Sequence, residues 1–399
     1  MHAPHNVRPT GSMTSRAAIV LQVSSLSAIS AAAGVPTPMY RIYAEHWGMS
    51  PVMVTTVFAV YAISLLGALL TVGGLSDYIG RRPMMFASLI ICALSMAVFA
   101  AADSVAALLA ARVIQGFGTG IAFGAIGAAI LDNLRTHGSL MNSVTPAAST
   151  GSGAILSGVL VTYAPMPTQL TYLILLGLML LQAALVWWMP ETAVKRPGAL
   201  ASMRPSIIVP VQARSALMLV SPGCIALWAL CGFYMTLMPS LLRTVSGSSS
   251  LLLGGVAIAV LTYSGGVAML TARSWPGITI LIRSMSALIL GVAITLSGVY
   301  AQSVSLLIGG TVIAGFGFGA GFFGGIRTVV PLALPHERAG LLSMIFVICY
   351  FAFSLPTIAA GLAVPVLGLP MTLYFYGAAV MVLAAISLIG LLSSTRRAA

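Results

Sequence analysis

The stretch GGLSDYIGRRPM, residues 73–84, places Asp77, Arg81 and Arg82 within one short segment of a chain in which only 6% of residues are charged. Apolar runs flank it at 51–72 and 83–102. Each run has the roughly 20 residues that a helix needs to cross a hydrocarbon core of about 30 Å. The stretch is therefore predicted to be a turn between two membrane spans.

Composition extends this prediction to the whole chain of 399 residues, of which 59% are hydrophobic. A soluble protein could not bury so much apolar surface, and only helices or closed barrels satisfy their backbone polar groups in lipid. We therefore expect an all-α membrane protein with twelve transmembrane helices. The predicted spans are 17–38, 51–72, 83–102, 104–130, 143–164, 169–189, 216–240, 250–271, 277–300, 303–326, 340–364 and 371–393.

Charge and cysteine patterns exclude other classes. The net charge is +12, but the 18 Lys and Arg residues are scattered and form no basic stripe with aromatic residues, so we expect no nucleic-acid partner. The four cysteines lie in apolar runs without metal-ligand spacing, and no metal or cofactor is expected.

Basic residues fall mostly on one side of the predicted spans, which places both termini in the cytoplasm of a cell-membrane protein. The predicted units are a tail (1–16), a six-helix bundle (17–189), a cytoplasmic linker (190–215), a second six-helix bundle (216–393) and a tail (394–399). Residues 27–34, SAISAAAG, resemble a signal-peptidase site. Cleavage there would remove the first span, whereas the internal repeat described below needs six spans in each half. Either Met1 or Met13 could be the natural start.

The two halves are related by an internal repeat. VIQGFGTGIAFGAI (113–126) aligns without gaps on VIAGFGFGAGFFGG (312–325), at an offset of half the chain. This predicts two pseudo-symmetric bundles. Small residues let helices approach closely, so the repeated glycines are predicted to pack helices: Gly116, Gly118, Gly120, Gly315, Gly317 and Gly319.

These motifs resemble the major facilitator superfamily (MFS). Residues 73–82 are similar to its motif A between helices 2 and 3, and RVIQGFGTG (112–120) to its motif B in helix 4. GVPTP (34–38) resembles the end of helix 1 in the twelve-helix drug/proton antiporter branch. The chain also departs from the family pattern: Tyr78 replaces the usual Arg of motif A. GAILSG (153–158) is a degenerate motif C, which weakens the assignment to the antiporter branch.

The resemblance implies a role for the opening stretch. In that family the motif A acid and arginine contact an acid at the end of helix 4, here Asp132, and the start of helix 11, and so latch the outward-facing state. A carboxylate also favours the positive end of a helix on general grounds. The predicted conformational latch comprises Gly73, Asp77, Gly80, Arg81 and Asp132.

Arg112 is predicted to lie about eight residues into helix 4, where a charge is costly unless it faces a partner or a wet cavity. Snorkelling to the surface is the alternative. The candidate residues for a substrate or proton cavity are Arg112, Gln115, Gln22, Ser25, Tyr234, Thr236 and Thr311. All six acids fall in loops or near span ends, so we expect a neutral or anionic substrate rather than a cationic one.

The sequence thus predicts a monomeric secondary transporter in the lipid bilayer that moves a small molecule by alternating access. Export of a drug or metabolite is preferred, with proton coupling left open. An importer of an organic anion or another small solute is the alternative. A membrane enzyme or receptor is remote, since no catalytic constellation or soluble domain is evident.

Overall fold

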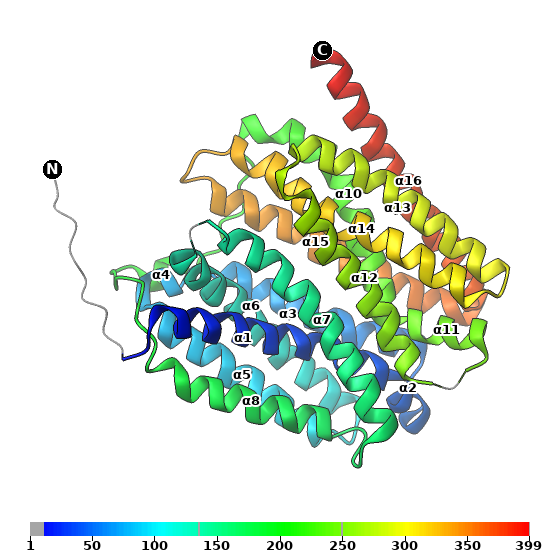
Figure 1. Ribbon diagram of the computed structural model, residues 1–399, viewed down its shortest axis with the longest axis horizontal. Coiled ribbons are helices and arrows are strands. Elements are labelled where there is room, and N and C mark those ends of the chain that lie inside the picture. Colours follow the sequence, from blue (N-terminus) through cyan, green and yellow to red (C-terminus); the bar gives the residue numbers. More distant parts are fainter. Residues whose placement is uncertain (1–11, 135, 249, 399) are drawn as a thin grey trace.

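The computed structural model describes residues 12–134, 136–248 and 250–398, and its regular elements in those ranges are all helical (Figure 1). Within these described ranges, eleven helical segments are long and apolar enough to cross a membrane, and Leu170–Val186 is a shorter apolar helix. The elements are α1 (Ser15–Gly34), α2 (Pro36–Trp47), α3 (Pro51–Val72), α4 (Ser76–Ile79), α5 (Arg81–Ala100), α6 (Val105–Asn133), α7 (Gly138–Tyr163), α8 (Leu170–Val186), α9 (Ala199–Ser202), α10 (Val211–Thr236), α11 (Met238–Ser246), α12 (Leu252–Thr271), η1 (Ala272–Ser274), α13 (Gly277–Tyr300), α14 (Val304–Val329), η2 (Val330–Leu332), α15 (Arg338–Leu367) and α16 (Leu369–Ala398).

The helices form two groups, and Figure 1 shows the blue-to-green helices gathered below the yellow-to-red ones. Helices α1–α8 surround one large buried apolar cluster and α10–α16 surround another. The groups meet mainly where α7 packs against α12 and α3 against α15. We call them the N-terminal and C-terminal bundles, and this arrangement confirms the predicted fold.

Several boundaries differ from the predicted ones. The first span breaks at Val35 and continues to Trp47, because Pro36 begins a new helix: proline lacks the N–H of a helix interior but suits a first turn. Helix α10 begins at Val211, five residues before the predicted start of the second bundle at 216. Helix α16 continues to Ala398, so most of the predicted tail 394–399 is helical.

The repeated glycines occupy equivalent places in the two bundles. A Cβ added at Gly116 or Gly120 of α6 would strike backbone carbonyls of α3, and one added at Gly315 or Gly319 of α14 would strike carbonyls of α12. The glycine between each pair faces a third helix instead: Gly118 lies against α5, and Gly317 against α13. Close approach through glycine therefore sets the packing of both bundles in the same way.

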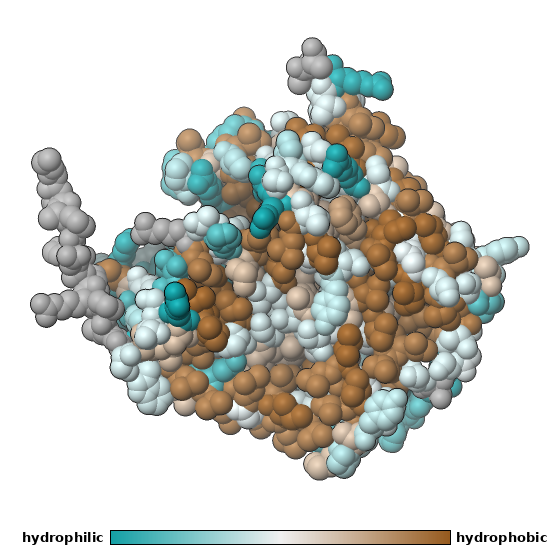
Figure 2. All heavy atoms as spheres, in the orientation of Figure 1, coloured by the Kyte–Doolittle hydropathy of each residue, from teal (hydrophilic) through white to brown (hydrophobic). Residues whose placement is uncertain are grey.

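Large apolar side chains cover much of the outside, and Figure 2 shows brown residues over most of the visible face. Leu181 and Ile389, for example, are 58% and 67% exposed. Such extensive apolar exposure marks a surface that meets lipid. The backbone N–H of Met13 donates to Trp188 O at 3.1 Å, so α1 begins where α8 ends. We call this the linker end and the opposite one the far end.

Candidate functional site

The turn between α3 and α5 is shaped by Gly80. Its φ of +109° lies in a region that favours glycine, and an added Cβ would also lie 2.7 Å from Glu191 Oε2. Helix α5 starts directly after it, so its first backbone N–H groups point towards the segment that follows α8. Nearby, an added Cβ at Gly124 of α6 would strike Gly73 O, which brings the start of the turn against α6.

Arg81 is the centre of an ion cluster at this turn. Its Nη1 lies 2.5 Å from Asp77 Oδ1 and donates to Ser76 Oγ at 2.6 Å, while its Nε donates to Asp132 Oδ2 at 3.1 Å. The Arg81 side chain is only 10% exposed, whereas that of Asp77 is 59% exposed. Four of the predicted latch residues, Gly80, Asp77, Arg81 and Asp132, thus come together, with Gly73 beside them.

Glu191 belongs to the same cluster and was absent from the sequence-based set. Its carboxylate accepts from the backbone N–H groups of Arg81 at 2.8 Å, Arg82 at 3.0 Å, Thr192 at 3.0 Å and Ala193 at 3.1 Å. A carboxylate at a helix N-terminus satisfies orphan donors and complements the helix dipole. The cue in the sequence that could have identified Glu191 was an acidic residue just after the sixth predicted span.

The cluster lines a cavity of about 430 Å³ at the linker end. Its walls come from the turn, from the end of α6 and from the linker, where Arg196 N donates to Tyr78 O at 2.9 Å. The lining residues are Asp77, Tyr78, Arg81, Asp132, Thr192, Ala193, Val194, Arg196 and Pro197. The expected contact from Asp77 to the start of helix 11, here α15, is not among the interactions of the described residues.

Arg112 is fully buried inside the N-terminal bundle. Its Nε and Nη2 donate to Tyr40 Oη at 2.9 and 2.5 Å, and its Nη1 donates to Gln115 Oε1 at 2.6 Å. Its Cζ also lies 5.2–6.0 Å from four ring centroids, those of Tyr40, Phe58, Tyr61 and Phe99. Aromatic faces and a neutral hydroxyl thus stabilise this charge, and it forms no ion pair with a described carboxylate.

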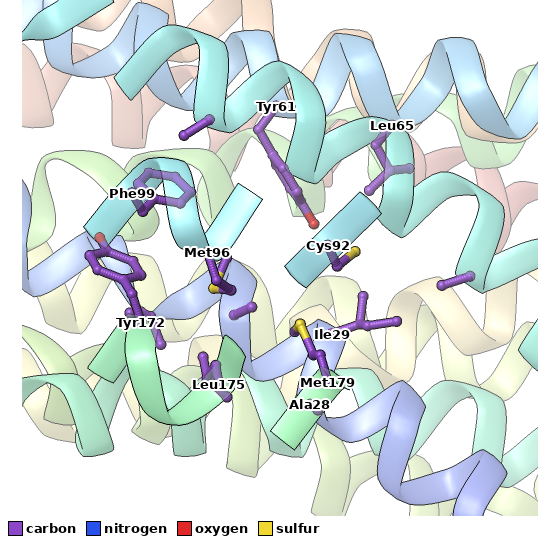
Figure 3. Close-up of a cluster of buried hydrophobic side chains, with 14 of the residues drawn as sticks. Ala28, Ile29, Tyr61, Leu65, Cys92, Met96, Phe99, Tyr172, Leu175 and Met179 are labelled. Carbon is purple, nitrogen blue, oxygen red and sulfur yellow. The ribbon is translucent and has the colours of Figure 1, made fainter. Parts of the chain in front are cut away.

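The ring of Phe99 joins this site to the bundle core. It stacks on Tyr172 with centroids 4.9 Å apart, and Figure 3 shows the two rings side by side. Tyr172 Oη lies 3.3 Å from Tyr43 Oη, which donates to it. The rings nearest to Arg112 come from α2, α3 and α5, and Tyr172 of α8 lies behind Phe99. Snorkelling to the outer surface, the alternative considered for Arg112, does not occur in this structure.

The other predicted cavity residues of the N-terminal bundle are also buried. Gln22 accepts at Oε1 from Asn133 Nδ2 at 3.3 Å, near the linker end of α6. Ser25 Oγ is buried and has no hydrogen-bond partner among the described residues. Gln115 Nε2 donates to Ala32 O at 2.8 Å, in the last turn of α1.

In the C-terminal bundle, Tyr234 Oη and Thr311 Oγ1 share a hydrogen bond of 2.8 Å and link α10 to α14. Thr236 donates to Gly232 O within its own helix at 2.8 Å. Among the seven candidate residues, Arg112 bonds to Gln115 and Tyr234 bonds to Thr311, whereas no described hydrogen bond joins Gln22, Ser25 or Thr236 to another member of the set. Their assignment to one substrate or proton cavity stays a prediction.

Comparison with known proteins agrees with this architecture. A family model described as Major Facilitator Superfamily matches residues 23–357. No curated protein sequence matches the chain at a significant level. Among solved structures, a point mutant of the nucleoside transporter NupG has a TM-score of 0.72 and 15% identity, covering 94% of this chain and 99% of its own. The human organic anion transporter MFSD10 (TETRAN) has a TM-score of 0.70 and 18% identity, covering 94% of this chain and 100% of its own. At these identities the likeness concerns the fold.

Proposed function

Because the chain belongs to the Major Facilitator Superfamily, a family of secondary transporters, we propose that it exports a small drug-like molecule or metabolite by alternating access. The observation that carries the proposal is the contact between two pseudo-symmetric bundles. At the far end, an added Cβ at Gly361 of α15 would strike Thr55 of α3, and Arg243 Nη1 of α11 lies 3.1 Å from Glu45 Oε1 of α2. The bundles are thus closely packed at that end.

The ion cluster is proposed to act as a latch at the linker end. Its links among Asp77, Arg81 and Asp132 stay within the N-terminal bundle, and the exposed side chain of Asp77 is placed to accept a further donor. In the proposed cycle, that donor is the positive N-terminus of α15. The contact would form when the linker end closes and the far end opens, and break again when the linker end opens.

Substrate charge follows from the charges inside the spans. Arg112 is a buried cation without a carboxylate partner in the described part of the chain, and the acids lie at helix ends or between helices. A buried positive charge repels cations strongly at low dielectric. We therefore favour a neutral or anionic substrate. The proline-bearing segment GVPTP (34–38), at the break in the first span, resembles the exporter branch, whereas an organic-anion importer is the alternative that Arg112 favours.

The latch is tested with single introduced cysteines, because all four native cysteines are buried. Thr55→Cys reports opening of the far end, and Val144→Cys on α7, which faces Gly266 of α12, reports the linker-end half. We expect Asp77→Asn to slow labelling at Thr55→Cys and to speed it at Val144→Cys. A bias of about 1.4 kcal/mol changes a two-state ratio tenfold. Unchanged labelling at both positions would reject the latch.

Direction is tested separately by transport in intact cells and in inverted membrane vesicles, with and without an imposed proton gradient. Export predicts uptake into inverted vesicles and reduced accumulation in cells. Accumulation by intact cells would support the importer instead. Stimulation of transport by the proton gradient would establish coupling, and an unchanged rate would argue against it.

A further inference from the structure

Trp228 of α10 contacts four aromatic rings from two other helices. Its ring centroid lies 6.3 Å from that of Phe318 and 5.4 Å from that of Phe322, both on α14. It lies 5.2 Å from Tyr350 and 5.5 Å from Phe353, both on α15. We call these five residues the aromatic box. Three of its four contacts are edge-on or nearly perpendicular, an arrangement that aromatic pairs favour.

The aromatic box lies between the two bundles. Trp228 and Phe318 pack against the buried apolar clusters of both bundles, and Phe353 pairs with Phe58 of α3 at 4.7 Å between centroids. Trp228, Phe318 and Phe322 are nevertheless only partly buried. These rings therefore lie on the surface that the bundles share, where rocking of one bundle against the other would change their exposure.

The indole N–H of Trp228 adds a polar handle. Nε1 is buried, and no acceptor for it exists among the described residues. Buried indole N–H groups normally find an acceptor, and an unpaired donor within a membrane is costly. A box with a free donor is therefore suited to a ligand that brings its own acceptor.

A buried charge lies one ring away from the aromatic box. Arg112 Cζ is 6.0 Å from the centroid of Phe58, whose ring contacts Phe353 of the box. The positive potential of Arg112 opposes a cation in the box, although aromatic rings can otherwise bind quaternary ammonium groups. A neutral or anionic ligand meets no such repulsion.

We propose that the aromatic box is the substrate subsite for planar aromatic molecules that carry a hydrogen-bond acceptor and no positive charge. The ligand ring would insert among the side chains of the box, and its acceptor would take the Trp228 indole N–H. This inference rests on the proposed transport function and specifies its substrate class.

The test is equilibrium binding by calorimetry to the full-length protein purified in detergent. The probes are benzoate, its non-aromatic analogue cyclohexanecarboxylate, the neutral heteroaromatic nicotinamide, and the cation benzyltrimethylammonium. We expect benzoate and nicotinamide to bind, and the other two to bind at least tenfold more weakly. Trp228→Phe keeps an aromatic ring but loses the N–H donor, so the affinity for both aromatic probes should fall about tenfold.

Trp275→Phe is the matched control, because Trp275 lies at the linker end beside Arg283, outside the aromatic box. It should leave the affinities unchanged. Phe318→Leu is a second variant should Trp228→Phe fail to fold, and it should weaken benzoate binding while sparing the N–H donor.

The proposal would be overturned by any of four results: unchanged binding by a folded box variant, equal binding of cyclohexanecarboxylate, preferential binding of benzyltrimethylammonium, or no binding by the aromatic probes. The labelling at Thr55→Cys needs no substrate. It therefore tests alternating access separately from ligand binding at the aromatic box.

Discussion

At the scale of single residues, Arg112 shows how a bundle can hold a charge without a counter-ion. Tyr40 Oη and Gln115 Oε1 accept its hydrogen bonds, and four aromatic ring centroids lie 5.2–6.0 Å from its Cζ. Hydrogen bonds to a charged group are stronger than those between neutral groups. Loss of one of these hydrogen-bond partners should therefore destabilise the protein more than loss of an ordinary buried polar contact.

Tyr40→Phe should consequently lower the stability of the protein. The change removes the hydroxyl that accepts from two nitrogens of Arg112 and leaves buried donors unpaired, at a cost of about 1.5–3 kcal/mol. Tyr43→Phe is the control, since it breaks only contacts with neutral groups. Thermal unfolding in detergent measures both variants. An equal loss of stability in the two variants would mean that the Tyr40 hydroxyl does not specifically stabilise the charged Arg112 side chain.

Glu191 is a second residue whose contribution to stability can be estimated from its hydrogen bonds. Glu191→Gln keeps one acceptor oxygen but turns an NH₂ group towards backbone N–H donors of α5, so we expect a loss of about 1–2 kcal/mol. Glu45→Gln serves as the comparison, because the exposed ion pairs of Glu45 should contribute little. A midpoint of unfolding that falls no further for Glu191→Gln than for Glu45→Gln would disprove the capping role.

At the scale of elements, the break in the first span has identifiable causes. Pro36 cannot donate to Ala32 O, and Gln115 of α6 donates to that carbonyl instead, at 2.8 Å. Three residues further on, Ser157 of α7 donates to Val35 O at 2.7 Å. Side chains of neighbouring helices thus bond backbone carbonyls on both sides of the break, as irregular backbone in a membrane requires.

The glycine contacts provide a prediction at the same scale. Gly116→Ala and Gly315→Ala should each force α6 or α14 away from its neighbour, since the new methyl group would meet a backbone carbonyl. Both should reduce the midpoint of thermal unfolding and the transport rate. Gly67→Ala on α3 meets nothing within 4 Å and should be neutral or slightly stabilising, because alanine favours helix. Tolerance of all three substitutions would show that the helices are not in close contact.

At the scale of the whole molecule, sidedness remains a proposal with a direct test. The start of α1 and the end of α8 lie together at the linker end, near the cluster of basic residues in the linker. We expect a reporter that is active only when exported to stay silent after Pro197 or Ala399. The same reporter should be active after Met166, in the loop between α7 and α8. Activity at either of the first two sites would reverse the assigned orientation.

Much of the architecture follows from the sequence alone, because the bilayer restricts the possibilities. Long uncharged runs must be helices, and their number and the repeat at 113–126 and 312–325 predict two bundles without any knowledge of contacts. The turn containing Asp77 and Arg81 was also predictable, since charged residues between two spans have to lie at a membrane surface. The pairing of Arg81 with Asp132 came from family resemblance, and the structure brings the two together.

Only the tertiary structure decided which residues complete each site. Glu191 lies 110 positions after Arg81, and its place after the sixth predicted span indicates a membrane boundary but does not identify the start of α5 as its partner. The same holds for the aromatic box, whose rings come from three helices and look like ordinary apolar residues in sequence. A hydrophobic run specifies that a helix crosses the membrane, but the face it turns to lipid, to its own bundle or to the opposite bundle depends on side-chain packing between helices distant in sequence.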